Sequence, residues 1–194
     1  MARVIARRRP AAGVTSPARA NSPRRPAHAA AATRPIACAV ITVSDTRGRS
    51  DDPGGDGLAR AIEGAGHRAA RRAWVRDEVR AIRAAVRAAL GAAAIDAVIV
   101  TGGTGIAPRD VTPEALAPLC DRTLAGFGEA FGALSRAQVG SAAWLSRAGA
   151  GVARGRLLFW LPGSPRGALL ALRELILPEL GHALRLLGRL TTEE

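Results

Sequence analysis

Hydrophobic and polar residues follow two kinds of pattern along the chain from residue 35 onward. The segment IACAVITVS is a continuous apolar run rich in β-branched residues, which is typical of a strand buried on both faces of a sheet. Other segments place apolar side chains three and four positions apart, the spacing of one helix face, and Gly66 follows the first of them as a stop signal. The pattern predicts strand 36–44, helix 56–67, a weak strand 68–75, helix 76–92 and strand 95–100.

Strands that alternate with helices predict a parallel sheet covered by helices, an α/β fold. The second half of the chain has less regular patterns. A loop and a helix are expected over 125–140, and two strands around Arg154-Gly155 within 147–163. Residues 165–188 are expected to be helical, and Pro178 should kink or split this helix because it lacks a backbone N–H group.

Composition narrows the class of protein. The chain has 194 residues, the length of one globular domain, and only 3% of them are aromatic, so the core must consist mainly of aliphatic residues and alanine. No apolar run reaches the ~18 residues that a membrane-spanning helix needs. The two cysteines, Cys38 and Cys120, lie far apart without metal-site spacing. We therefore expect a cytoplasmic protein with free thiols and no membrane partner.

The net charge of +12 is concentrated at the N-terminus. Residues 1–34 are rich in Ala, Arg, Pro and Ser, contain eight arginines and no acid, and show no apolar period. We interpret them as a disordered tail ahead of a folded domain at residues 35–190. The tail could contact nucleic acid or another polyanion weakly, it could have no fixed role, or the true start could lie downstream. We do not expect nucleic acid as a partner.

Three loops rich in small residues follow three of the expected strands: SDTRG at 44–48, TGGTG at 101–105 and LPGSP at 161–165. Open α/β sheets bind ligands beyond the carboxyl ends of their strands. Glycine N–H groups can approach an anion closely, and Ser and Thr hydroxyls add donors. Together the loops predict a phosphate-binding crevice. One such turn alone is as often a tight connection, and TGGTG matches neither a Walker A loop nor the dinucleotide fingerprint.

Two carboxylates, Asp77 and Asp110, also fall on connections that follow strands. Carboxylate oxygens at this edge could hold Mg²⁺ against phosphate oxygens. Each acid has a structural interpretation as well, Asp77 as a helix cap or first-turn acid and Asp110 as the residue of an Asx-type turn. Thr112, Pro113 and Glu114 have the pattern of a helix start, with threonine as its cap.

Several segments resemble, in this order, the MoaB/MogA family of molybdenum cofactor biosynthesis proteins: TVSDTRG, DDPGGDGLARAIEGAGH, TGGTGIAPRDVTPEAL, DRTLAGFGEAFGALS and LPGSPRGALLAL. The resemblance covers about residues 35–188. It implies a three-layer α/β/α sandwich with a mostly parallel sheet and a molybdopterin-binding pocket. It also implies Mg²⁺-dependent transfer of AMP from ATP to the terminal phosphate of molybdopterin, with the two important aspartates of the family at Asp77 and Asp110.

These observations define the candidate site. Asp77 and Asp110 are the catalytic candidates and the candidate Mg²⁺ ligands, with ATP and molybdopterin as substrates. The family further suggests a homo-oligomer, either a trimer or a hexamer, and a hand-over of the product to a molybdenum-insertion protein. The candidates for substrate and phosphate binding are Ser44, Asp45, Thr101, Gly102, Gly103, Thr104, Gly105, Arg109, Ser146, Pro162, Gly163 and Ser164.

Two other functions stay open at this point. Some bacterial MoaB proteins are thought to lack AMP transfer because they differ at the acidic positions. This chain keeps both acids and keeps Arg109 beside Asp110, but its loop from SDTRG to DDPGGDG is more similar to the MoaB branch. A catalytically silent molybdopterin binder or carrier is therefore the first alternative. A nucleic-acid-binding protein that uses the arginine-rich tail is the second.

Overall fold

The computed structural model describes residues 34–46, 48 and 51–190. A six-stranded sheet in the order β2-β1-β3-β6-β5-β4 forms its centre. The strands β2, β1, β3 and β6 pair in parallel. Strand β5 is antiparallel to β6, and β4 is antiparallel to β5. The strands are β1 (Ala37–Val43), β2 (Arg68–Val75), β3 (Ala97–Thr101), β4 (Arg122–Thr123), β5 (Gly149–Ala153) and β6 (Arg156–Leu161). The α-helices are α1 (Pro53–Gly64), α2 (Val79–Gly91), α3 (Thr112–Leu116), α4 (Ala125–Val139), α5 (Pro165–Ala171) and α6 (Leu177–Leu186).

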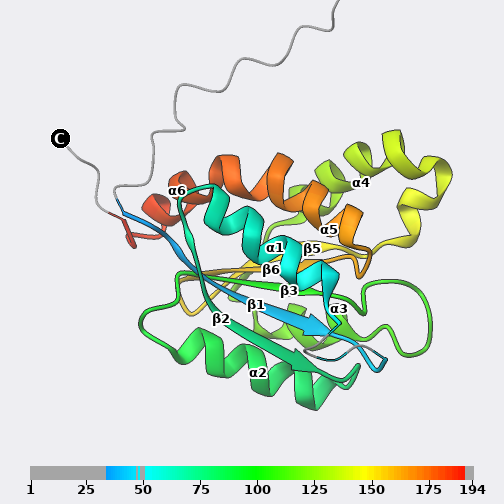
Figure 1. Cartoon of the computed structure of the whole chain (residues 1–194), viewed down its shortest axis with the longest axis horizontal. Helices are drawn as coiled ribbons and strands as arrows, with labels where there is room; N and C mark the ends of the chain where they lie inside the picture. Colours follow the sequence, from blue (N-terminus) through cyan, green and yellow to red (C-terminus); the bar gives the residue numbers. More distant parts are fainter. Residues whose placement is uncertain (1–33, 47, 49–50, 191–194) are drawn as a thin grey trace, which may run out of the picture.

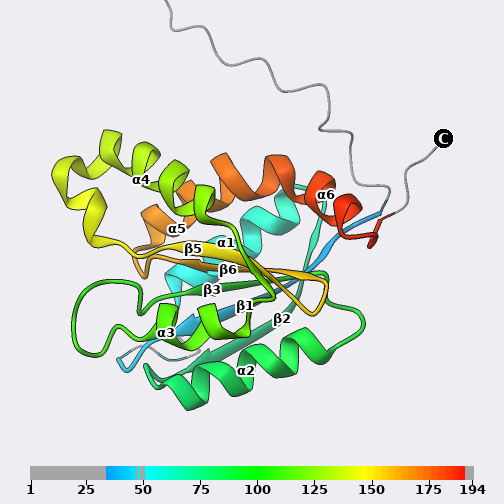
Figure 2. The same ribbon diagram turned by 180° about the vertical axis from the view of Figure 1, so that it is seen from behind.

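The sheet lies between two helical layers, which confirms the predicted three-layer α/β/α sandwich with its mostly parallel sheet (Figure 1). Helices α1, α4, α5 and α6 cover one face, and α2 and α3 cover the other (Figure 2). Strand β1 has a continuous apolar sequence because it contributes to both cores. Cys38 and Val40 belong to the core under α1, while Ala39 and Ile41 belong to the core under α2.

The first two helices begin at other residues than the sequence predicted. α1 begins at Pro53, inside the stretch that was expected to be a loop. The Asp52 carboxylate accepts a hydrogen bond from the Gly55 backbone nitrogen at 2.8 Å and so caps this helix. α2 begins at Val79, later than expected, and Glu78 at its cap position makes no side-chain capping bond.

The C-terminal helical segment is divided as predicted. A five-residue π-helical segment, η3 (Leu172–Ile176), separates α5 from α6. Pro178 lies in the first turn of α6, where its missing N–H group removes no α-helical hydrogen bond. The two strands predicted around Arg154-Gly155 are β5 and β6, and Arg154 has the left-handed backbone conformation of a tight turn, with φ of 51°.

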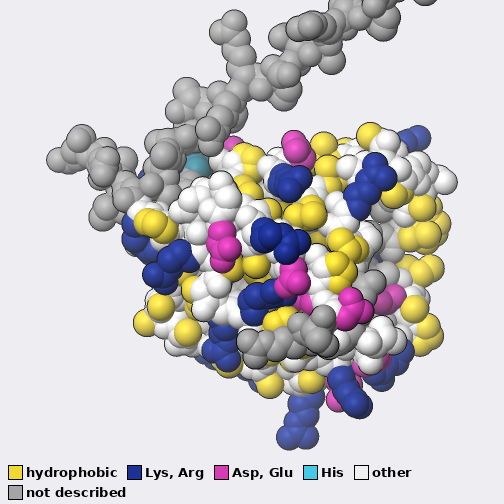
Figure 3. All heavy atoms as spheres, in the orientation of Figure 1, with side chains coloured by type: hydrophobic (Ala, Val, Ile, Leu, Met, Phe, Trp, Pro, Cys, Tyr) yellow, Lys and Arg dark blue, Asp and Glu magenta, His cyan; other side chains and the backbone are white. Residues whose placement is uncertain are grey.

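One end of the molecule carries apolar side chains on its surface. Two 3₁₀ segments, η1 (Ala117–Leu119) and η2 (Gly140–Leu145), follow α3 and α4. Hydrophobic groups gather over η2 and the end of α4 (Figure 3). Val139 is 54% exposed there and Trp144 is 75% exposed. Within the described ranges, none of the helices combines the length and the apolar character needed to cross a membrane.

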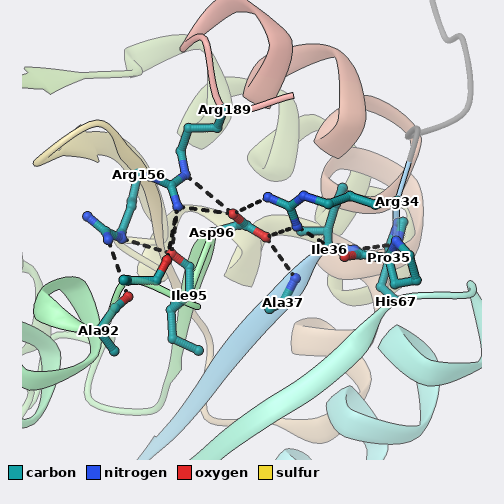
Figure 4. A network of polar contacts seen from close by, with 11 residues as sticks. Arg34, Pro35, Ile36, Ala37, His67, Ala92, Ile95, Asp96, Arg156 and Arg189 are labelled. Atoms are coloured by element: carbon teal, nitrogen blue, oxygen red, sulfur yellow. Dashed lines mark hydrogen bonds and ion pairs between the residues drawn. The ribbon is translucent and has the colours of Figure 1, made fainter. Parts of the chain in front are cut away.

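A buried carboxylate joins both ends of the described chain at the amino end of the parallel strands (Figure 4). Asp96, 1% exposed, accepts hydrogen bonds from Arg34 at 2.7 and 2.9 Å, from the Ala37 backbone nitrogen at 3.0 Å and from Arg189 at 3.1 and 3.3 Å. Residues 1–33 of the expected tail lie outside the described residues. Arg34, the last residue of that expected tail, is bound to the domain.

Candidate functional site

The three small-residue loops meet at one edge of the sheet, as the sequence predicted. Thr42 of β1 is level with Thr101 of β3, and Thr101 is level with Leu161 of β6, so the three chains leave the sheet side by side. Hydrogen bonds then join two of the loops. The Gly102 nitrogen donates to the Leu161 carbonyl at 3.1 Å, and the Thr101 hydroxyl donates to the Pro162 carbonyl at 2.7 Å.

The glycine pair after β3 is required by its surroundings. Gly102 and Gly103 have φ angles of 106° and 63°, a conformation that L side chains rarely adopt. A Cβ atom at Gly102 would collide with the Val43 carbonyl, and one at Gly103 would lie 2.6 Å from Asp77 Oδ1. The backbone at Gly103 therefore passes directly beside a carboxylate that the sequence had marked as catalytic.

Thr112 does not cap helix α3, so that prediction was wrong. Val111 occupies the cap position without a side-chain capping bond, and Thr112 is the first residue of the helix. The Thr112 hydroxyl, fully buried, donates to the Gly102 carbonyl at 2.8 Å instead. It holds the glycine turn rather than the helix. Pro113 and Glu114 lie in the first turn, as predicted.

Two cavities open on either side of the glycine turn. The larger is about 490 Å³ in volume and is covered by α4 and η2, which contribute mainly apolar groups such as Phe131 and Leu145. The smaller is about 250 Å³ in volume and is lined by four acids, Asp45, Asp52, Asp77 and Asp110. The residues that line both cavities are Gly103, Asp110 and Gly163.

Most of the predicted site residues line one or both cavities. Arg109 does not line either of them. Ser146 has its hydroxyl buried in the larger cavity, without a hydrogen-bond partner among the described residues. The residues of the larger cavity include Gly103, Thr104, Gly105, Asp110, Ser146, Pro162, Gly163 and Ser164. Those of the smaller include Ser44, Asp45, Asp77, Thr101, Gly102, Gly103, Asp110 and Gly163.

Asp77 does not cap helix α2, which begins two residues after it. The cap position of α2 belongs to Glu78, so the interpretation of Asp77 as a helix cap was wrong. Its Oδ1 atom is buried and has no hydrogen-bond partner among the described residues. Burial raises the pKa of Asp77, and the charges of Asp45 and Asp110 raise it further. Ionisation of Asp77 thus costs more free energy in the smaller cavity than in water, as is common at functional sites.

Asp110 closes a turn, though not the Asx-type turn that was expected, and also reaches the cavities. Its Oδ2 atom accepts a hydrogen bond from the Ala107 backbone nitrogen at 2.8 Å and so closes the turn over residues 107–110. This bond points back along the chain, unlike that of a standard Asx turn. The side chain lines both cavities and lies next to Gly105, where a Cβ atom would be 2.7 Å from Asp110 Oδ2.

Arg109 is paired with an acid at the rim of the smaller cavity. Its guanidinium donates to Asp45 Oδ2 at 2.6 and 2.9 Å, and Asp45 Oδ1 accepts from the Asp77 nitrogen at 3.2 Å. The bond from Arg109 lowers the pKa of Asp45. Both partners are partly exposed, so the pair is open to exchange with an incoming anion.

Sequence reasoning missed several residues that build the site. Asp52 is buried below the smaller cavity and accepts hydrogen bonds from Thr42 at 2.7 Å and from Arg72 at 2.8 Å. The Asp-Pro pair that begins α1 is a helix-start signal that could have identified Asp52. Phe131 and Ser135 of α4 line the larger cavity, and the segment DRTLAGFGEAFGALS that contains them was noted only for its family resemblance.

The residues of the smaller cavity fit a Mg²⁺ ion that is shared with substrate phosphates. Asp77 offers an unpartnered carboxylate oxygen, and Asp45 and Asp110 line the same space. Among the residues that the structure describes, no three His, Cys, Asp or Glu side chains come together as a ready-made metal site. Mg²⁺ commonly binds through one or two carboxylates, water and phosphate oxygens, so substrate would complete such a site.

Substitution of Gly103 should affect both the fold and the site. We expect Gly103→Ala to lower the free energy of unfolding by about 1–3 kcal/mol, because alanine is strained at positive φ and its Cβ would press on Asp77. Pyrophosphate binding should weaken as well. Gly132→Ala in α4 is the matched control, since nothing lies near its Cβ position and alanine favours a helix. Equal urea midpoints for the two variants would contradict the expectation.

Fold and site together define an α/β protein with a crevice at the carboxyl ends of its parallel strands, lined by glycine-rich loops and acids. Residues 39–182 match the family described as a probable molybdopterin binding domain. The chain therefore belongs to this family, which contains proteins of molybdenum cofactor biosynthesis, and the resemblance noted in the sequence is confirmed.

Individual relatives agree with this assignment. The chain is 42% identical to molybdenum cofactor biosynthesis protein B of Halalkalibacterium halodurans over 159 residues, or 81% of this chain and 94% of the relative. A crystal structure of a molybdenum cofactor biosynthesis protein B superimposes with a TM-score of 0.79 at 40% identity and covers 82% of this chain and 99% of its own. A structure of MogA superimposes with a TM-score of 0.69 at 31% identity and covers 78% of this chain and 99% of its own.

Proposed function

We propose that this protein binds molybdopterin and transfers AMP from ATP to the terminal phosphate of the pterin. One observation carries the proposal: a mainly apolar cavity and an acidic cavity share the turn at Gly103, with Asp110 in both and the unpartnered oxygen of Asp77 beside it. Two phosphorylated molecules bound on either side would bring their phosphates together at this junction.

Each part of the site has a role in such a transfer. The backbone N–H groups of the glycine turn hold phosphate oxygens, and the larger cavity encloses an apolar ring system. An oxygen of the pterin phosphate attacks the α-phosphorus of ATP, a P–O–P bond forms, and pyrophosphate leaves with the electron pair of the broken bond. Phosphoryl-type transfer depends on positioning and on charge neutralisation, which the paired loops provide.

Asp77 and Asp110 would hold Mg²⁺, which neutralises phosphate charge when it is bound. The raised pKa of Asp77 supports this role, because a nearby cation would remove the cost of keeping the carboxylate ionised. Arg109, paired with Asp45 at the rim, supplies a positive charge that an incoming phosphate could engage.

The decisive experiment is an AMP-transfer assay on the purified protein with ATP, Mg²⁺ and molybdopterin. Formation of adenylylated pterin and pyrophosphate is the expected result. Binding of molybdopterin without turnover would instead favour a silent binder or carrier. That second candidate is supported by the higher identity to biosynthesis protein B than to MogA.

We also propose that the chain forms a trimer or hexamer and passes its product to a molybdenum-insertion protein. The exposed Val139 and Trp144 at one end of the molecule support self-association, since large apolar groups in contact on a surface often mark an interface. Light scattering should show several copies per particle, and Trp144→Ser should reduce that number. A monomeric wild-type protein would contradict this proposal.

A further inference from the structure

Arg147 contacts the loop at residues 104–110 from outside the crevice. Its Nε donates to the Gly105 carbonyl at 2.8 Å, and its Nη2 donates to the Asp110 carbonyl at 2.6 Å. Nη1 forms an ion pair with Glu114. The backbone nitrogen of Arg147 donates to the Thr104 carbonyl at 2.8 Å. One residue therefore holds both ends of the loop that carries Asp110.

The backbone of Arg147 is itself anchored to the sheet. Trp160 of β6, 7% exposed, donates from its indole nitrogen to the Arg147 carbonyl at 3.0 Å. Arg147 lines neither of the two cavities at the glycine turn; it lies on the outer side of the loop, in a hollow with Glu114. Its side chain therefore acts on the site through the loop and not by contact with the two cavities.

Only arginine can make this set of contacts. Its planar guanidinium presents several donors in a rigid fork, so it can bond two carbonyls and a carboxylate at once. A lysine ammonium is a single point charge on a flexible stem and could reach one carbonyl without fixing the other. The geometry thus requires the shape of the side chain as well as its charge.

We infer that Arg147 is a positioning residue, which fixes the loop over residues 105–110 so that the Asp110 carboxylate stays at the junction of the two cavities. The inference rests on the proposed AMP transfer. The turn at Gly102 is held separately, by Leu161 and Thr112, so the part of phosphate binding that this turn provides does not depend on Arg147. Loss of the arginine should therefore slow the transfer step more than it weakens substrate binding.

Arg147→Gln tests this inference, with Arg156→Gln as the matched control. Arg156 also donates to backbone carbonyls, of Ile95 at 2.8 Å and of Ala92 and Arg154 at 3.2 Å, but at the opposite end of the sheet (Figure 4). We expect similar losses of Tm in both variants. Only Arg147→Gln should lower kcat, by about 10-fold or more, because small displacements of a catalytic group are costly. KM for both substrates should stay within about 3-fold of wild type.

Two further measurements separate positioning from a general loss of stability. Arg147→Lys should recover only part of kcat, since it restores the charge and not the fork. Backbone amide exchange in residues 104–111 should accelerate in Arg147→Gln and stay unchanged in Arg156→Gln.

The possible outcomes distinguish this inference from the proposed function. Equal kcat values and equal loop exchange in the two glutamine variants would overturn the role of Arg147. A wild-type protein without AMP transfer would overturn the proposed function and with it a catalytic role for this arginine. In that case faster loop exchange in Arg147→Gln alone would still establish that Arg147 fixes the loop, and unchanged exchange would overturn this as well.

Discussion

Asp77→Asn is expected to lower AMP transfer about 100-fold while raising the Tm by a few degrees. The transfer falls because the amide keeps the shape of the carboxylate and loses the charge that would hold Mg²⁺. The Tm rises because the folded protein no longer contains an ionised group that burial and two neighbouring acids disfavour. A loss of activity together with a gain in Tm distinguishes a functional acid from one that stabilises the fold.

The gain in Tm should depend on pH in one direction. The pKa of Asp77 is raised in the folded protein above its ordinary value of 3.8. Below that ordinary value the carboxyl is neutral in both the folded and unfolded states, so Asp77→Asn should have the Tm of the wild type. The advantage of the variant should appear as the pH rises through the interval up to the folded pKa. Thermal unfolding from pH 3 to 7 would measure it.

Asp110→Asn provides a companion test of the catalytic assignment. Its amide oxygen can still accept the bond from Ala107, so the turn should be retained while the charge is lost. Transfer should again fall about 100-fold or more. Molybdopterin affinity should be kept or increased, because a negative charge beside an anionic ligand has been removed. The loss of transfer activity in the Asp77→Asn/Asp110→Asn double variant should be far smaller than the product of the two single losses. Full activity in both single variants would remove the catalytic role of these acids.

Asp96→Ala should have the largest effect on stability. Removing this carboxylate takes away the acceptor that binds Arg34, Arg189 and the Ala37 nitrogen. Breaking a buried ion pair on one side typically costs ~3 kcal/mol or more. For a domain of this size that corresponds to a fall in Tm of about 6–12 °C. Chemical denaturation of the variant would measure the loss directly.

The ion pairs of Asp96 should also make the stability of the protein fall at low pH. Burial alone would raise the pKa of Asp96, but the bonds from Arg34, the Ala37 nitrogen and Arg189 outweigh it and lower the pKa to about 2. The resulting stabilisation, about 2 kcal/mol, is present above the ordinary pKa of 3.8 and is lost as the pH falls towards 2. Asp96→Asn should therefore show a flatter Tm profile in that interval.

A partly exposed acid is the control for the predicted effect of Asp96 on stability and its dependence on pH. Asp56 is also paired with an arginine, Arg72, but its side chain is 43% exposed. Asp56→Asn should leave the Tm close to that of the wild type, because exposed ion pairs contribute little. A profile of Asp96→Asn that runs parallel to the wild type between pH 4 and pH 2 would show that the buried carboxylate is not the origin of the acid sensitivity.

The strands and the meeting of the three loops could be predicted because their signals are local. β1 and β3 are apolar except for one buried threonine each because both faces are buried, and a parallel sheet brings the residues after its strands to one edge. Asp77 and Asp110 were identified as candidates for the same reason. Their roles in transfer stay predictions.

The remaining contacts could not be predicted because they depend on packing between distant segments. Arg147 binds backbone carbonyls, which every residue has, so its partners leave no pattern in the sequence. Thr112 has the position of a helix cap, yet the approach of the Gly102 carbonyl gives its hydroxyl another partner. Phe131 reaches the larger cavity only because α4 packs over the sheet beside β5.

The carboxylate of Asp96 also determines how this domain can be joined to other chains. Because Arg34 and Arg189 bind the same side chain, the first and last described segments leave the domain next to each other (Figures 1 and 4). The crevice lies at the other end of the strands. A polypeptide joined directly to residue 34 or residue 190 would begin on the side opposite the crevice, so the described domain can be inserted as a module into a longer protein with its crevice still open to solvent.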